Sequence, residues 1–251
     1  MTLAVLALAS FFAGLIDAVA GGGGLVTIPT LFSLYPATAP ATLVGTNKAG
    51  VIFGTGAAAY RYVRQVRVYW SSTLPTMVSA FLFAIAGAHL LKQFPAEPLR
   101  RALPFVLLAL LLYMVANKSL GLTHAPRASG HGERLLGIAG GAIIGMYDGF
   151  FGPGAGSFLI LLFVRGFGYD FLHANASGKL VNLATNAAAI LLLALAGHVW
   201  WRLSVLIAVA NIAGSVVGSH LAVRYGSELI RRVFVVVVAA LIVKTAYDAF
   251  G

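Results

Sequence analysis

Two aspartates and two lysines are the clearest candidates for chemical function in this sequence, because they interrupt long apolar stretches. Asp17 and Asp148 each precede a glycine-rich run, and Lys48 and Lys179 lie near the start of the next apolar stretch. An ionisable group inside a membrane span is costly unless it is paired or hydrated, so each is a functional candidate. The carboxylates could exchange protons or meet substrate, or they could cap the helix that follows. The lysines could face a polar cavity, or they could extend to the lipid headgroups.

The glycine-rich runs Gly21–Gly24 and Gly152–Gly156 predict breaks in helical structure. A glycine costs about 1 kcal/mol relative to alanine within a helix. The helix that follows a break begins with unpaired N–H groups and the positive end of its dipole. Glycine also lets a ligand approach the backbone closely. Two such helix ends and two lysines predict a site for small anions near the middle of the membrane.

A polar stripe follows the second break, where Asn175, Lys179, Asn182 and Asn186 share one helix face by their spacing. A polar face turned to lipid would be prohibitive, so we expect it to face a partner helix or a water-filled path. The first half offers a weaker set at the corresponding place, namely Thr46, Asn47, Lys48 and Thr55.

The composition excludes a soluble domain. The chain has 251 residues, of which 60% are hydrophobic and only 10% are charged, and its mean hydropathy is +0.92. Soluble domains carry roughly 25% charged residues. The chain has 17 basic and 7 acidic residues, and the basic residues flank the apolar segments. This placement is typical of residues that set the orientation of a protein in a membrane, and not of a nucleic-acid-binding surface. We therefore expect an all-α, multi-pass integral membrane protein.

The two halves of the chain are related by a constant spacing. Asp148 lies 131 residues after Asp17. The same spacing relates Gly14, Gly21, Gly23, Lys48, Gly87, His89 and Arg100 to Gly145, Gly152, Gly154, Lys179, Gly218, His220 and Arg231. We interpret this register as two tandem repeats, residues 1–118 and 134–251, joined by a polar linker at 119–133.

Each repeat is expected to contain one glycine-broken element followed by three transmembrane helices, since a span needs about 20 apolar residues. The broken elements are Leu3–Leu34 and Leu135–Val164. The expected helices are Leu43–Tyr60, Trp70–Leu91 and Leu99–Ala116, then Ala174–Ala196, Trp201–Val223 and Leu229–Ala246. Inverted repeats are favoured over parallel ones, because inversion puts ten Lys and Arg residues on one side of the membrane and five on the other.

Three segments of the first half together resemble the sulfite exporter TauE/SafE family of membrane permeases. They are Gly14–Asp17, Gly21–Pro29 and Gly45–Asn47, and the second half repeats the pattern in looser form. The resemblance implies an inner-membrane transporter of small sulfur-containing anions, such as sulfite or organosulfonates. The second half departs from the pattern at three positions. Pro153, Ile160 and Gly178 stand there at the places of Gly22, Pro29 and Asn47 in the first half.

The sequence thus predicts a membrane transporter of small anions, with a passive anion channel as the alternative. No enzyme activity, cofactor or metal is expected, because there is no cysteine and the histidines are scattered. The expected partners are the anionic substrate and the lipid bilayer, with homo-oligomer formation left open. Asp17 and Asp148 are assigned to coupling or helix capping. The expected substrate-binding residues are Gly21, Gly22, Gly23, Gly24, Thr46, Asn47, Lys48, Gly152, Gly154, Gly156, Asn175, Lys179, Asn182 and Asn186.

Overall fold

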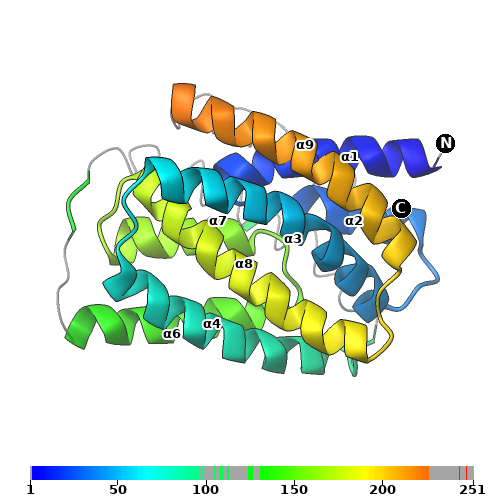
Figure 1. The fold of residues 1–251 in the computed structure, drawn as a ribbon. Helices are drawn as coiled ribbons and strands as arrows, with labels where there is room; N and C mark the ends of the chain where they lie inside the picture. Colours follow the sequence, from blue (N-terminus) through cyan, green and yellow to red (C-terminus); the bar gives the residue numbers. More distant parts are fainter. Residues whose placement is uncertain are drawn as a thin grey trace.

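The computed structural model describes residues 2–95, 98, 105, 108–109, 112, 124–126, 131–225, 243 and 247. Its regular secondary structure within these residues is entirely helical (Figure 1). Most of the expected spans Leu99–Ala116 and Leu229–Ala246, and most of the linker at 119–133, lie outside the described residues.

Two groups of helices make up the described chain. The N-terminal group comprises α1 (Thr2–Ala20), α2 (Gly24–Leu34), α3 (Pro40–Gln65) and α4 (Trp70–Leu91). The C-terminal group comprises α6 (His131–Phe150), α7 (Ala155–Leu161) with the short π-helix η1 (Leu162–Gly166), α8 (Phe171–Leu195) and α9 (Trp201–Tyr225). The helices α3 and α8 begin 131 residues apart, and so do α4 and α9.

Both glycine runs interrupt the helix, as their composition predicts. The first interruption separates α1 from α2 at Gly21, whose φ is +72°. The second separates α6 from α7 at Gly152 and Gly154, whose φ values are +94° and +78°. A side chain would strain the backbone at these angles, so glycine is needed there.

The later helices start at or near the expected residues, but α3, α8 and α9 are longer than their apolar stretches. The helix α4 coincides with Trp70–Leu91, whereas α3 runs from Pro40 to Gln65 instead of from Leu43 to Tyr60. Proline is favourable in the first turn of a helix, which accounts for the earlier start. The helix α3 also continues beyond its apolar part. Hydropathy predicts only the segment that lies in lipid, whereas backbone hydrogen bonds determine where the helix ends.

Helices from opposite groups pack closely through glycine. A Cβ added at Gly145 of α6 would clash with the backbone of Ala80 in α4, and one at Gly14 of α1 would clash with Asn211 in α9. Small residues let helix backbones approach within a membrane. The helix pairs α4–α6 and α1–α9 therefore join the two groups along the two long edges seen in Figure 1.

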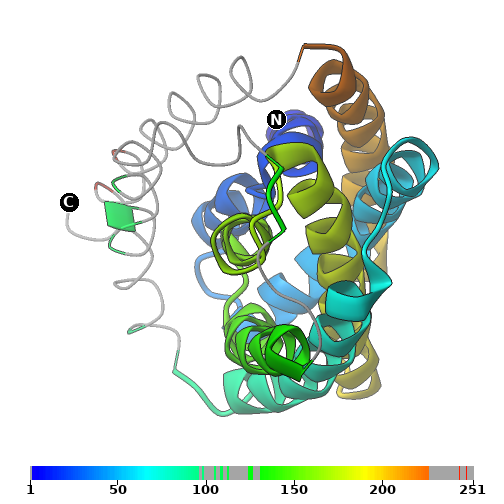
Figure 2. The same cartoon turned by 90° about the vertical axis from the view of Figure 1, so that its left-hand side faces the viewer.

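The equivalent helices α3 and α8 run in opposite directions. The Oγ1 atom of Thr42, near the start of α3, lies 3.0 Å from Nδ1 of His198, just after the end of α8. At the other end, Nδ2 of Asn175 in α8 donates to the hydroxyl of Tyr62 in α3 at 2.9 Å. The short helices α2 and α7 lie between α1 and α6 (Figures 1 and 2).

Apolar side chains face outward and polar ones face inward, as expected for a membrane protein. Leu8, Leu82 and Val209 are 58–66% exposed, whereas Lys179 is 1% exposed. Four described helices are long and apolar enough to cross a membrane, namely α1, α4, α8 and α9. The protein is therefore a multi-pass integral membrane protein.

The glycine contact between α4 and α6 predicts a sharp difference between two alanine substitutions in α6. Gly145→Ala should lower the free energy of unfolding by about 1–3 kcal/mol, because the added methyl group forces the two backbones apart. Gly132→Ala is the matched control, since its added Cβ would meet no atom within 4 Å. Thermal unfolding in detergent measures the stability of both variants. Equal stability of the two would contradict the packing role of Gly145.

Candidate functional site

The two helix breaks lie against each other in the interior. A Cβ added at Gly21 would clash with the backbone of Gly156, and one at Gly24 would lie 3.4 Å from the Cα atom of Pro153. The hydroxyl of Ser157 donates to the carbonyl of Ala20 at 2.7 Å. The start of α7 therefore contacts the end of α1.

A small polar cavity lies at this junction. Its volume is about 30 Å³, which is room for about two water molecules. Residues of both helix groups form its wall, namely Asp17, Gly21, Gly23, Gly24, Ile28, Asn47, Lys48, Val51, Thr55, Asp148, Gly152, Gly156, Asn182, Asn186 and Asn211. Most of the site residues expected from the sequence thus converge on one cavity.

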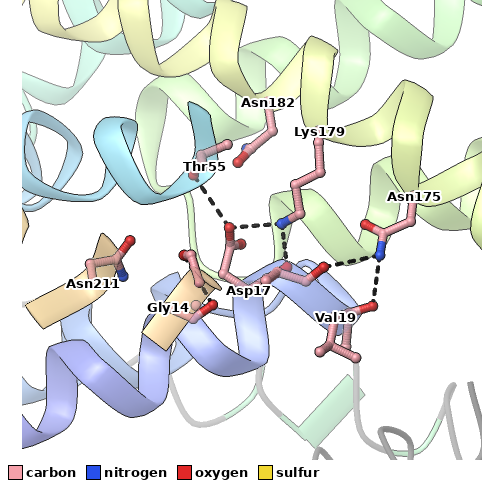
Figure 3. Close-up of polar contacts among 12 residues, drawn as sticks. Gly14, Asp17, Val19, Thr55, Asn175, Lys179, Asn182 and Asn211 are labelled. Atoms are coloured by element: carbon pink, nitrogen blue, oxygen red, sulfur yellow. Dashed lines mark hydrogen bonds and ion pairs between the residues drawn. The ribbon is translucent and has the colours of Figure 1, made fainter. Parts of the chain in front are cut away.

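The first aspartate forms a buried ion pair across the two helix groups. The Nζ atom of Lys179 in α8 lies 2.7 Å from Oδ2 of Asp17 in α1. The hydroxyl of Thr55 in α3 donates to the same carboxylate at 3.3 Å (Figure 3). Lys179 also donates to the backbone carbonyl of Asp17. The ammonium group is therefore bound to both the side chain and the backbone of one residue.

The second aspartate forms the reciprocal ion pair. The Nζ atom of Lys48 in α3 lies 2.8 Å from Oδ1 of Asp148 in α6 and donates to Oδ1 of Asn186 at 3.1 Å. The amide of Asn182 is 3.5 Å from the other carboxylate oxygen of Asp148. Lys48, Asp148 and both asparagines line the cavity, so this ion pair is part of its wall.

These ion pairs decide between the roles that the sequence left open for the two lysines and the two aspartates. The side chains of Lys48 and Lys179 are only 3% and 2% exposed, so neither lysine extends to the lipid headgroups. The hydrogen bonds that the two carboxylates accept come from side chains and not from the backbone N–H groups of α2 or α7. The capping role considered for Asp17 and Asp148 is therefore not found, because each carboxylate is paired with a lysine of the opposite group.

Side chains from α3 and α8 complete the hydrogen bonding at the end of α1, where the last carbonyl groups lack helical partners. The amide of Asn175 donates to the carbonyls of Ala18 and Val19 at 3.1 and 2.9 Å, as Figure 3 shows. The hydroxyl of Tyr62 donates to the carbonyl of Ala18 at 2.7 Å. Asn175 thus stabilises the broken end of α1.

Some expected site residues do not form the cavity wall. They are Gly22, Thr46, Gly154, Asn175 and Lys179. The hydroxyl of Thr46 instead accepts from the backbone N–H of Trp200 at 2.9 Å. Lys179 is held at Asp17, next to the wall.

Asn211 lines the cavity but was missed by the sequence interpretation. Its amide donates to the carbonyl of Ser10 at 3.2 Å, while its Oδ1 atom is buried without a hydrogen-bond partner, as is that of Asn47. A single asparagine within the apolar helix α9 was the available signal, because a polar group in a span needs a partner. Asn47 and Asn211 both belong to the cavity wall.

Comparison with known proteins places the chain in a family. The family model described as sulfite exporter TauE/SafE matches residues 6–245. The chain is 36% identical over 251 residues to the probable membrane transporter protein YfcA of Escherichia coli strain K12, covering 100% of this chain and 92% of the relative. No solved structure matches.

Two further relatives carry the same description. The probable membrane transporter protein ORF9 of Sinorhizobium sp is 35% identical over 247 residues, covering 98% of this chain and 93% of the relative. A probable membrane transporter protein of Haemophilus influenzae is 32% identical over 246 residues, covering 98% of this chain and 95% of the relative. These matches confirm the resemblance drawn from the glycine-rich segments. The chain therefore belongs to the sulfite exporter TauE/SafE family and is a multi-pass membrane transporter.

Proposed function

We propose that the protein transports small sulfur-containing anions, such as sulfite or organosulfonates, through the cavity between the two helix breaks. The observation that carries this proposal is that one cavity is lined by both glycine breaks and by Lys48. The helices α2 and α7 begin at this cavity, so the positive ends of their dipoles favour an anion there. Glycine at the breaks exposes backbone N–H groups for close contact.

Lys48 is proposed to be the first side chain that binds the anion. Its ammonium group lies on the cavity wall and is bound by Asp148 and Asn186. An arriving anion competes with the carboxylate of Asp148 for this group. Protonation of Asp148 would free Lys48 for the anion, so the ion pair links substrate binding to proton uptake.

Asp17 is proposed to have a structural role. Its partner Lys179 also binds the carbonyl group of the same residue, and Thr55 supports the carboxylate. The pair therefore fixes the end of α1 against α8. This arrangement assigns the two aspartates different tasks although the sequence places them symmetrically.

Two inverted repeats, residues 1–118 and 134–251, are proposed to rock against each other about the cavity. The antiparallel α3 and α8 support inversion, and so do the reciprocal ion pairs. Alternating access in such transporters moves one repeat or bundle relative to the other around a fixed site. A small cavity bridged by an ion pair favours a transporter over the alternative of a passive anion channel, because a channel needs a continuous pathway.

Transport in proteoliposomes tests the substrate class and the role of Lys48. Sulfite or an organosulfonate such as sulfoacetate should be taken up in preference to sulfate and small carboxylates. Lys48→Met should reduce uptake by more than about 10-fold, because loss of a charge-assisted contact costs about 1.5–3 kcal/mol. Accumulation against a gradient separates a transporter from a channel.

A double variant controls for damage to the fold in this experiment. Lys48→Met alone leaves Asp148 as an unpaired buried charge, which costs about 3–5 kcal/mol. Adding Asp148→Asn removes that charge and should restore stability without restoring transport. Recovery of transport in the double variant would show that Lys48 serves only to neutralise Asp148.

Separate substitutions of the two aspartates test coupling. Asp148→Asn should abolish the dependence of transport on pH, because the amide cannot exchange a proton. Asp17→Asn should retain that dependence while lowering stability, since it weakens the contact with Lys179. Transport is measured from pH 5 to pH 8, and an unchanged pH profile in Asp148→Asn would exclude the coupling role.

Single-cysteine labelling tests the inversion, and the chain has no cysteine to interfere. Gln65 at the end of α3 and Ala196 after the end of α8 are equivalent exposed positions. Gln65→Cys and Ala196→Cys should react with an impermeant maleimide from opposite sides of the membrane. Leu172→Cys, at the start of α8, is the control and should react from the same side as Gln65→Cys. Reaction of Gln65→Cys and Ala196→Cys from one side would indicate parallel repeats.

A further inference from the structure

Two histidines and one aspartate form a cluster outside the cavity. His124 belongs to the segment that links the two helix groups, whereas Asp170 and His173 lie at the start of α8. One nitrogen or oxygen atom from each residue lies within 4.8 Å of the others. His124 and Asp170 are 46 positions apart in the sequence, so the sequence alone did not bring them together.

The spacing of the donor atoms suits a tetrahedral metal ion. The Nδ1 atom of His173 lies 2.7 Å from Oδ1 of Asp170, and Nδ1 of His124 lies 3.6 Å from Oδ2 of the same carboxylate. Metal bonds of about 2.0–2.1 Å in a tetrahedron place neighbouring donor atoms about 3.3 Å apart. The two observed distances bracket that value, and all three donor atoms lie within 4.8 Å of one another.

Tyr69 orients one of the histidine rings. Its hydroxyl lies 2.9 Å from Nε2 of His124, and the backbone N–H of Asp170 donates to Nδ1 of the same ring at 3.3 Å. The proton of His124 is thus on Nε2, and the lone pair of Nδ1 accepts from the backbone N–H of Asp170, which a metal ion would replace. Metal-binding histidines are commonly fixed by such a contact at the other ring nitrogen.

We propose that His124, Asp170 and His173 bind a divalent transition-metal ion such as Zn²⁺. Two imidazole nitrogens and one carboxylate oxygen suit zinc and its neighbours better than Mg²⁺ or Ca²⁺, which prefer sites made of oxygen alone. A water molecule would complete the fourth position. The ion ties the linker to the start of α8 and, through Tyr69, to the segment between α3 and α4.

Metal titration of the purified full chain tests this site, using an affinity tag without histidine and protein stripped with EDTA. The wild type should bind one Zn²⁺ per chain, and its thermal unfolding midpoint should rise and then fall again when EDTA is added. His124→Ala and His173→Ala should each weaken binding by about 100-fold, whereas Tyr69→Phe should weaken it by about 10-fold.

Two controls separate metal binding from effects on folding. Asp170→Asn keeps an oxygen to accept from the backbone N–H of His173 but loses the charge, so it should fold normally and bind Zn²⁺ weakly. His89→Ala and His220→Ala change exposed histidines elsewhere and should bind as the wild type does. Absence of binding to the wild type, or binding by His124→Ala and His173→Ala as tight as that of the wild type, would overturn the proposal.

Discussion

The structure depends on a requirement that no buried charge may remain unpaired. Asp17 and Asp148 are isolated in the sequence among apolar residues, and so are Lys48 and Lys179. A single charge left in such an interior costs several kcal/mol, so each one needs an opposite charge at hydrogen-bonding distance. The fold meets this requirement by pairing each aspartate with the lysine of the other helix group. The pairing holds the groups together and also places charged side chains beside the cavity.

The glycine residues make these ion pairs geometrically feasible. Gly14 and Gly145 allow α1 and α6 to approach α9 and α4 closely, which places the two breaks side by side in the interior. Positive φ angles at Gly21 and Gly152 end the first helix of each group. The carbonyl groups exposed at the end of α1 are then bound by Asn175 and Tyr62. Close packing and a broken backbone thus create one polar site inside an apolar molecule.

The two halves of the site are similar in position but different in chemistry. Lys48 contacts Asp148 and Asn186 on the cavity wall, whereas Lys179 lies outside the wall and also binds the α1 backbone. This asymmetry is the basis for the proposal that one ion pair responds to substrate while the other preserves the shape of the site. A divalent ion bound at His124, Asp170 and His173 would add a constraint on the segment that joins the groups, through residues that are not part of the cavity wall.

The sequence by itself determined the helical membrane class, both breaks, the starts of α4 and α9, and most residues of the cavity wall. These features depend on local composition and on a spacing of 131 residues, and both can be seen directly in the sequence. Only the tertiary structure decided which lysine pairs with which aspartate, because the partners are 100 and 162 residues apart. It also brought Asn211 into the cavity and assigned Asn175 to the end of α1. Antiparallel packing of α3 against α8 sets these contacts, and packing across the two halves of a chain is not encoded in any local pattern.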